Sequence, residues 1–373
     1  MTATLRRPTT GATPLTPPTP VPAPRPGSVA VVLGSRSEVF ALAPVLSALG
    51  DSAGVLRPGR ELPGAATRAE DRDRRIAVAL NRLRQVFAAD RPDAVLVPGA
   101  TDTALAAALA ADAQGIPLVR LGAGLRSREP DRPEEHNRVL LDRACDVLCA
   151  STPVNVANLE ADGLGDRDVR LTGDTTVEAV RHRLMPERDR RAVLRQRGLE
   201  PDRYVLATIG HPENVDDEEA LFALANQLAG VVDAGHPVVL PVDPRTRAAL
   251  DRTGILSSGV DLRVVDRLWH SEFLALARHA ALLVTDSGAV QQEATVLKRP
   301  VLVVRRSTER PEVLRDFGAP VRPHDDITGI ALGWLDRDGD ARRAGLAGLP
   351  SPFGDGRSGE RIADVVRSLV RAG

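Results

Sequence analysis

The sequence predicts an α/β protein built from two doubly wound parallel sheets. Short apolar runs, such as residues 29–33, recur along the chain, and most are followed by a turn and a helical pattern. Such runs are typical of buried parallel strands, and their alternation with helices indicates parallel sheets. The series occurs twice, on either side of a charged stretch at residues 186–198. A length of 373 residues also favours two domains over one.

The domains follow from these patterns. We expect a disordered Pro-rich tail at residues 1–27, because proline fixes φ and removes backbone donors. Two Rossmann-like domains are expected at 28–197 and 198–355, and a C-terminal helix at 356–373 that packs back on the first domain. The expected strands are residues 29–33, 94–97, 116–121 and 147–150, then 204–209, 237–240, 262–265, 282–285 and 300–304. Ligands of such folds bind beyond the carboxyl ends of strands, here in the cleft between the two domains.

Composition excludes several classes of function. The 49 basic and 50 acidic residues leave a net charge of -1, so the chain lacks the basic excess of a nucleic-acid binder. No apolar run is long enough to span a membrane, and the N-terminus lacks the apolar region of a signal peptide, so we expect a cytoplasmic protein. Cys145 and Cys149, the only cysteines, do not have the spacing of a metal site.

A phosphate site is predicted at residues 286–288. Asp286, Ser287 and Gly288 follow the expected strand at 282–285 and begin a helix, where free N–H groups and the positive helix end favour a diphosphate. Ordinary capping by Ser287 is compatible with this function. Arg36 and Arg310 can add bidentate contacts to phosphate oxygens, and a surface salt bridge is the alternative for both.

Six motifs, in order, resemble those of the UDP-N-acetylglucosamine 2-epimerases. The resemblance runs from about residue 28 to residue 370, nearly the whole ordered chain. GSRSE at 34–38 resembles the family's GTRPE turn, and GLRS at 124–127 with PEEHNR at 133–138 resembles AGLRS…PEExNR. The other four are TGDT at 172–175, TDSGAVQQEA at 285–294, TERPE at 308–312 and FGDGR at 353–357, which resemble TGNT, TDSGGxQEEA, TERPE and YGDGKA.

The resemblance implies a GT-B fold, which consists of two Rossmann-like domains, and a UDP-sugar as the ligand. It implies that Glu293 accepts hydrogen bonds from the ribose hydroxyls and that Phe273 packs on the uracil, with core packing as the alternative for Phe273. Arg138 belongs to the PEExNR motif and is a further candidate site residue. The family works as homodimers without a metal or nicotinamide, and the sequence has no metal-ligand cluster and no GxGxxG after its first strand.

The sequence departs from the family at the sugar. The family reaction removes the C2 proton and expels UDP, and it uses an Asp after an HG turn, the Glu of HVEAGLR, the first Glu of PEE and the His of HRRE. Here Ala100 and Gly122 occupy the first two positions, and Glu134 is retained at the third. Gly210 aligns with the histidine, and His211 lies one residue later, so a local shift would bring His211 into place.

Other residues are candidates to replace the lost groups. Asp102 lies two positions after Ala100 at the start of an expected helix, where a first-turn charge is the alternative role. His211 and Glu213 lie just after a strand, where ligands bind in such folds. The candidate catalytic residues are therefore Glu134, His211 and Asp102.

Three functions remain open at this point. The first is a 2-epimerase of UDP-N-acetylglucosamine or a related nucleotide-sugar, either complete or releasing UDP and an altered sugar. The second is a UDP-sugar-dependent glycosyltransferase, which needs little general-base chemistry at C2 and would suit Ala100 and Gly122. The third is a non-catalytic UDP-sugar-binding protein. The Arg- and Ala-rich composition is the one hint of a host with specialised metabolism, such as antibiotic assembly.

Overall fold

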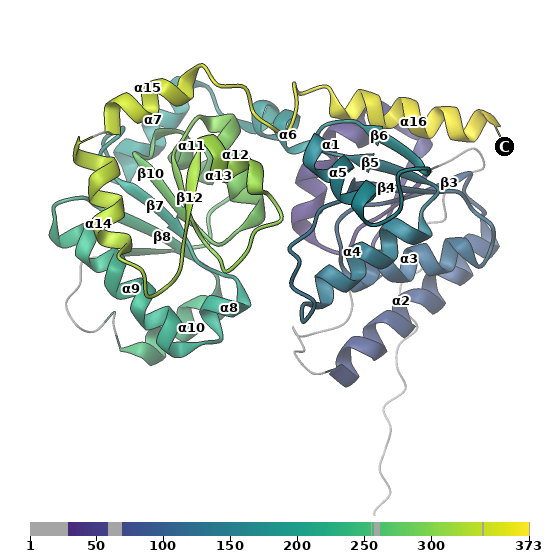
Figure 1. Cartoon of the computed structure of the whole chain (residues 1–373), viewed down its shortest axis with the longest axis horizontal. Coiled ribbons are helices and arrows are strands. Elements are labelled where there is room, and N and C mark those ends of the chain that lie inside the picture. The colour runs from purple at the N-terminus through teal and green to yellow at the C-terminus, as the bar shows by residue number, and fades with distance from the viewer. Residues whose placement is uncertain (1–28, 59–68, 255, 257–261, 338, 373) are drawn as a thin grey trace, which may run out of the picture.

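The chain forms two α/β lobes, each around one parallel sheet (Figure 1). The computed structural model describes residues 29–58, 69–254, 256, 262–337 and 339–372, so the expected tail at 1–27 lies outside the described residues. Each sheet has six strands, and every strand pairing is parallel. The predicted fold class is therefore confirmed.

The first sheet has the strand order β2-β1-β3-β4-β5-β6. Its strands are β1 (Val29–Val32), β2 (Ala53–Leu56), β3 (Ala94–Val97), β4 (Leu118–Ala123), β5 (Val147–Ala150) and β6 (Asp168–Leu171). Its helices are α1 (Arg36–Leu49), α2 (Ala69–Ala89), α3 (Asp102–Asp112), α4 (Pro133–Ala144) and α5 (Pro153–Ala161). Alternate residues of β1 enter two different buried clusters, so helices cover both faces of the sheet.

The second sheet has the order β12-β11-β10-β7-β8-β9, which is the order of a Rossmann sheet. Its strands are β7 (Val205–Thr208), β8 (Val238–Val242), β9 (Arg263–Asp266), β10 (Leu282–Thr285), β11 (Val301–Val304) and β12 (Gly318–Val321). The helices that follow these strands are α8 (Pro212–Val215), α9 (Glu218–Asp233), α10 (Pro244–Thr253), α11 (His270–His279), α12 (Gly288–Leu297), α13 (Pro311–Asp316) and α14 (Ile327–Leu332). The strand order reverses between β7 and β10, which are neighbours in the sheet.

Three strands were not expected from the sequence, namely β2, β6 and β12. All three are edge strands, and the side chains of β2 and β6 are largely half-buried or exposed; the fourth edge strand, β9, was expected. An exposed edge strand does not need a continuous apolar run, so it lacks the pattern that identifies buried parallel strands. The expected bounds of β3, β5 and β10 agree with the structure to the residue.

The two lobes are linked twice. The chain first crosses through α6 (Thr176–Arg183) and α7 (Glu187–Gln196), whose Val180 and Leu194 are buried in the same cluster as β7 and β10. The packing of the second lobe thus begins ahead of residue 198, because the apolar side of the charged stretch is buried there. After α15 (Gly339–Ala347) the chain returns as α16 (Ser358–Ala372), which lies along α1 and buries Ile362 and Val366 (Figure 1).

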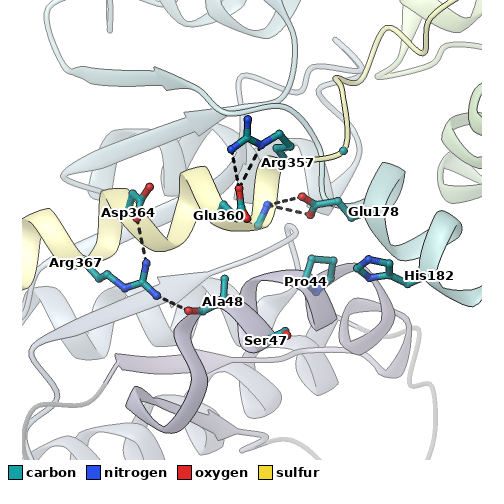
Figure 2. A pocket seen from close by; sticks show the side chains of 11 residues that line it. Pro44, Ser47, Ala48, Glu178, His182, Arg357, Glu360, Asp364 and Arg367 are labelled. Carbon is teal, nitrogen blue, oxygen red and sulfur yellow. Dashed lines mark hydrogen bonds and ion pairs between the residues drawn. The ribbon is translucent and has the colours of Figure 1, made fainter.

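The junction of α1, α6 and α16 is held by charged groups (Figure 2). The carboxylate of Glu178 on α6 accepts from the backbone N–H of Gly359 at 2.9 and 3.2 Å, which caps the start of α16. Arg367 donates to Asp364 at 3.0 Å and to the backbone oxygen of Ala48 on α1. A surface pocket of about 570 Å³ lies among these residues. None of the described helices is both long and apolar enough to cross a membrane.

A buried ion pair fixes the loop that leaves β4. Asp142 on α4 is fully buried and lies 3.2 Å from Arg120 on β4 and 2.7 Å from Arg126. Oδ2 of Asp142, the oxygen near Arg126, also accepts from the backbone N–H of Gly124 at 3.0 Å. The carboxylate therefore neutralises two buried guanidinium groups and fixes the start of the loop that leads to α4.

We expect Asp142→Ala to lower the free energy of unfolding by about 3–5 kcal/mol, because it leaves buried Arg120 without an ionic partner and buried Arg126 with Asp162 alone. Urea unfolding followed by circular dichroism measures this loss. The matched control is Asp364→Ala, which removes an exposed partner of Arg367 and should change the free energy of unfolding by about 0.5 kcal/mol or less. Equal effects of the two substitutions would contradict the importance of the buried pair.

Candidate active site

The point of order reversal in the second sheet carries the loops that follow β7 and β10. The buried carboxylate of Asp286, after β10, accepts from the backbone N–H groups of Gly210 at 3.0 Å and His211 at 2.8 Å. It also accepts from Nδ2 of Asn214 at 3.0 Å. Burial raises the pKa of Asp286, and these hydrogen bonds partly offset that effect. Asp286 thereby fixes the loop that presents His211.

The corresponding point in the first sheet lies between β1 and β3. Glu38 on α1 accepts from the backbone N–H groups of Gly34 at 2.7 Å and Ser35 at 3.0 Å, and this closes the turn after β1. A Cβ atom at Gly34 would collide with Thr101, because the loops after β1 and β3 pack directly together. The side chain of Arg36, a predicted phosphate ligand, lies outside the described residues.

The structure describes the backbone at Ala100, Gly122 and Gly210, the three positions where the sequence was expected to depart from the family. The carbonyl of Ala100 accepts from Nδ2 of Asn137 on α4 at 2.9 Å. Gly122 lies at an irregularity of β4 and has a φ of 69°, a conformation that side chains with a Cβ rarely adopt. Gly210 has open space where a Cβ would lie, so packing there does not require glycine.

Asp102 begins α3 and is engaged in ion pairs. Its carboxylate lies 2.9 Å from Nε of Arg72 and 3.1 Å from Nη2 of Arg75, and it also accepts from Asn137 at 3.2 Å. Burial alone would raise the pKa of Asp102, but the hydrogen bonds from Asn137, Arg72 and Arg75 outweigh this and lower it. An ionised, paired carboxylate holds α2, α3 and α4 together at the end of β3.

Glu134 lies in the first turn of α4 and is exposed. Among the described residues, no group forms a hydrogen bond or ion pair with its carboxylate. The next residue, Glu135, is instead buried and accepts from the backbone N–H groups of Ser127 at 2.9 Å and Arg128 at 3.0 Å. The neighbouring carboxylates thus differ: Glu135 organises the loop, and Glu134 is available to a ligand.

Arg132, just before α4, crosses from the first lobe to the second. Its Nη1 lies 3.2 Å from Nε2 of His211, and its Nη2 pairs with the carboxylate of Glu213. Because arginine only donates, Nε2 of His211 accepts from it, and Nδ1 lies 3.4 Å from the backbone nitrogen of Glu213 and 3.7 Å from its carboxylate. This contact brings the first turn of α4 opposite the loop that carries His211.

Burial and the neighbouring arginines keep the ring of His211 neutral. Burial is the larger cause, and the charges of Arg305 and Arg132 add to it, so that the pKa of His211 falls to about 3. At neutral pH the ring therefore carries a single proton, and its other nitrogen is a hydrogen-bond acceptor.

Arginine and glutamate side chains from both lobes continue this network. Arg138 on α4 lies 2.7 Å from Glu135 and 2.8 Å from Glu309 of the second lobe. Burial alone would raise the pKa of Glu309, but Arg138, Arg310 and Arg305 hold it at about 2. Arg305 also lies 3.0 Å from Glu213. We call this set the interdomain Arg/Glu cluster: Arg132, Arg138, Arg305, Arg306 and Arg310 with Glu129, Glu135, Glu213 and Glu309.

The N-terminus of α12 carries the predicted phosphate residues. Ser287 is the N-cap residue, and its side chain makes no capping hydrogen bond. A Cβ atom at Gly288 would collide with Nη1 of Arg310, so the guanidinium lies directly against the first turn of the helix. Burial lowers the pKa of Arg310, and its Nε is buried without a hydrogen-bond partner among the described residues. The guanidinium of Arg310 and the positive end of the α12 dipole therefore lie at the same place.

The second turn of α12 and the start of α11 form the adjoining part of the site. Glu293 on α12 is 93% buried at its side chain and lies 2.7 Å from Nε2 of His270, the first residue of α11. Phe273 is buried in the core of the second lobe, where it packs in the same cluster as Val290. The structure thus brings Ser287, Gly288, Arg310 and Glu293 together around one helix.

Several residues of the site had no signal in the sequence. Arg132 and His270 approach the site across the lobes or between helices, and only the tertiary structure brings them there. Glu309 lies within the TERPE motif, but the sequence assigned it no role. Asp286 was placed in the predicted phosphate loop, but its carboxylate faces the β7 loop instead. No group of three or more His, Cys, Asp or Glu suited to a metal occurs within the described ranges.

Comparisons with known proteins show the family of this chain. The family model for UDP-N-acetylglucosamine 2-epimerase matches residues 57–367. The chain is 32% identical over 293 residues to the UDP-N-acetylglucosamine 2-epimerase of Methanococcus maripaludis, which covers 77% of this chain and 78% of that protein. The chain belongs to the UDP-N-acetylglucosamine 2-epimerase family.

Two further members extend the comparison. This epimerase-family chain is 32% identical over 243 residues to the UDP-2,3-diacetamido-2,3-dideoxy-D-glucuronate 2-epimerase of Pseudomonas aeruginosa, over 63% of this chain and 65% of that protein. The crystal structure of Methanocaldococcus jannaschii UDP-GlcNAc 2-epimerase in complex with UDP-GlcNAc and UDP matches with a TM-score of 0.80 and 27% identity. That match covers 91% of this chain and 99% of the other. The family predicted from the six motifs is therefore confirmed.

The depressed pKa of His211 predicts its titration. The NMR shift of its Cε1 proton should stay constant from pH 8 to pH 5, whereas a histidine reference peptide titrates near 6.5. Because the unfolded chain binds this proton below about pH 6.5 and the folded chain does not, His211 lowers stability as the pH falls from about 6.5 toward 3. The resonance is identified by its loss in His211→Asn. A midpoint near 6.5 would contradict the influence of burial and the arginines.

Proposed function

We propose that this protein is an epimerase that inverts C2 of UDP-N-acetylglucosamine or a closely related UDP-sugar. The observation that carries the proposal is the position of Arg310, whose guanidinium lies against Gly288 at the start of α12 with a buried, unpaired Nε. Nη1 of Arg310 lies 3.5 Å from Glu309, but Nε has no acceptor among the described residues, so the guanidinium can still bind an anion, and the helix N-terminus favours the same charge. The family relationship supports the diphosphate of a UDP-sugar as that anion.

The nucleotide is held by the second lobe in this proposal. Ser287, Gly288 and Arg310 bind the diphosphate, and Arg36 reaches it from the first lobe. Glu293 accepts from the ribose hydroxyls, and Phe273 supports the uracil. The support for these assignments is that α12 presents free N–H groups, a cation and a carboxylate within two turns. Each group matches one part of UDP in chemical character.

The sugar reacts between the lobes. Glu134 removes the C2 proton, the C–H electrons form a C1–C2 double bond, and UDP leaves with the electrons of the C1–O bond. C2 then receives a proton from solvent on the opposite face, UDP adds back to C1, and Glu134 returns its proton to solvent, which yields the epimer. Glu134 suits the base role because its carboxylate is exposed and unpaired among the described residues.

His211 acts on the leaving group in this scheme. Its low pKa is caused by burial and by Arg305 and Arg132, and the negative diphosphate would offset that positive field and raise the pKa of the bound enzyme. His211 can then donate a proton to the departing phosphate oxygen. Arg138 and Glu213 position the loops of the two lobes through the interdomain Arg/Glu cluster. Asp102, paired with Arg72 and Arg75, is assigned to the organisation of the sugar side.

The substrate is a UDP-sugar with a C2 proton, and UDP-N-acetylglucosamine is the first to test. The Pseudomonas aeruginosa relative supports an acetamido sugar with further substituents as the alternative. A homodimer, a cytoplasmic location and a place in specialised metabolism stay predictions from the sequence.

Incubation with UDP-N-acetylglucosamine in D2O tests the reaction. We expect proton NMR to detect deuterium at C2 together with UDP-N-acetylmannosamine or free N-acetylmannosamine. Glu134→Gln should lower the rate of exchange by about 10²–10⁴-fold, because the base is lost. Asp131→Asn is the matched control, since Asp131 is an exposed carboxylate three residues away, and it should keep the wild-type rate. Binding of the substrate without exchange would overturn the epimerase proposal for this sugar.

Arg310→Lys tests the diphosphate site. We expect UDP affinity, measured by calorimetry, to fall by about 10–100-fold, because lysine cannot reproduce the two-pronged contact of the guanidinium. Uridine, which has no phosphate, should bind the variant and the wild type equally. If uridine and UDP lose affinity by the same factor, Arg310 supports the fold of the site and does not contact the diphosphate.

A further inference from the structure

An aromatic ring of the first lobe is held between two side chains that pack with the second. Phe40 on α1 stacks on the ring of His270, with centroids 5.2 Å apart and an angle of 22° between the ring planes. The guanidinium carbon of Arg183, at the end of α6, lies 4.2 Å from the centroid of the Phe40 ring. Because α6 and α11 both pack in the core of the second lobe, this triple stack connects the lobes without any ion pair.

The stacked histidine also contacts the proposed ribose ligand. Nε2 of His270 lies 2.7 Å from Oε1 of Glu293. A carboxylate only accepts, so Nε2 of His270 carries the proton and donates it. The other ring nitrogen, Nδ1, is buried and has no hydrogen-bond partner among the described residues. The orientation of His270 is thus set by two contacts, the Phe40 ring on its face and Glu293 at its edge.

We propose that His270 is a positioning residue for nucleoside recognition, which directs the carboxylate of Glu293 toward the ribose hydroxyls and is itself held by Phe40. This inference rests on the proposed function, in which Glu293 accepts from the ribose. The donor at Oε1 fixes the carboxylate in one rotamer, and no described group donates to Oε2, which is left for a hydroxyl. Recognition of the ribose therefore depends on a residue of the opposite lobe, Phe40, that does not contact the carboxylate.

The geometry favours this role over a purely structural one. A buried carboxylate requires a partner, but His270 is 19% exposed at its side chain and lies at the first turn of α11, where the chain has just left β9. Its stack joins the lobe that carries Glu134 to the lobe that carries Glu293. A histidine whose function was only to neutralise Glu293 would not require the ring of Phe40 on its face.

The test is the preference of the protein for UDP over 2′-deoxy-UDP and 3′-deoxy-UDP, measured by calorimetry. His270→Phe keeps the stack and removes the donor. Of the two preferences, for UDP over 2′-deoxy-UDP and for UDP over 3′-deoxy-UDP, we expect the larger to fall by about tenfold, the effect of one hydrogen bond to a charged group. Glu293→Gln should show the same loss. His270→Gln should retain most of the preference, because its amide can donate to the carboxylate. Phe40→Leu should lower the preference by about threefold.

Controls separate this effect from a loss of folding. His236→Gln alters another histidine–carboxylate pair, in which His236 lies 2.9 Å from Asp336 on the far side of the second lobe, and should leave the preference unchanged. Each variant is compared with the wild type by its melting temperature. Calorimetry of the His270→Gln variant keeps the test valid if His270→Phe does not fold.

The outcomes distinguish the inference from the proposed function. Absence of UDP binding by the wild-type protein would overturn both. If UDP binds and Glu293→Gln lowers the ribose preference, an unchanged preference in His270→Phe would overturn the role of His270 alone. An unchanged preference in Glu293→Gln would overturn the ribose assignment and this inference with it. A wild-type preference in Phe40→Leu would overturn the contribution of the opposite lobe.

Discussion

The contact of Arg132 with His211 and Glu213 connects the carboxyl end of one sheet to the carboxyl end of the other. Parallel sheets place the loops that follow their strands at one edge, so each lobe alone offers half of a site. The charges that face each other across the interface decide how these halves meet. Because the interdomain Arg/Glu cluster has more guanidinium groups than carboxylates, the same contacts that join the lobes leave a positive site for a diphosphate.

The two halves of the site are built by different physical means. The nucleotide half uses the backbone of α12 and side chains that pack against it, and a helix N-terminus keeps its charge whatever the surrounding sequence. The sugar half uses individual side chains on loops, such as Glu134 and His211. Side chains on loops depend less on the packing of the fold than the backbone of a helix does.

Sequence patterns predicted the parts of this protein that depend on local chemistry. Buried strands such as β3 and β10 were located to the residue, since a parallel strand covered on both faces must be continuously apolar. The edge strand β6 has no such requirement and was not predicted. Ser287 and Gly288 were recognisable because a strand, a turn and a helix start leave a local signature. The pairing of His270 with Glu293 has no such signature, because the two residues lie 23 positions apart in the sequence, with a strand between them.

On the sugar side of the site, the backbone is constrained at Gly122 and at Ala100. Gly122 has a φ of 69° at an irregularity in β4. A residue with a Cβ would be strained in that conformation. Ala100 differs, because its backbone carbonyl is held by Asn137, and Asn137 also holds Asp102. The sugar side of this chain thus combines a backbone bulge with a network of ion pairs, and Glu134 and His211 are the candidate catalytic groups there.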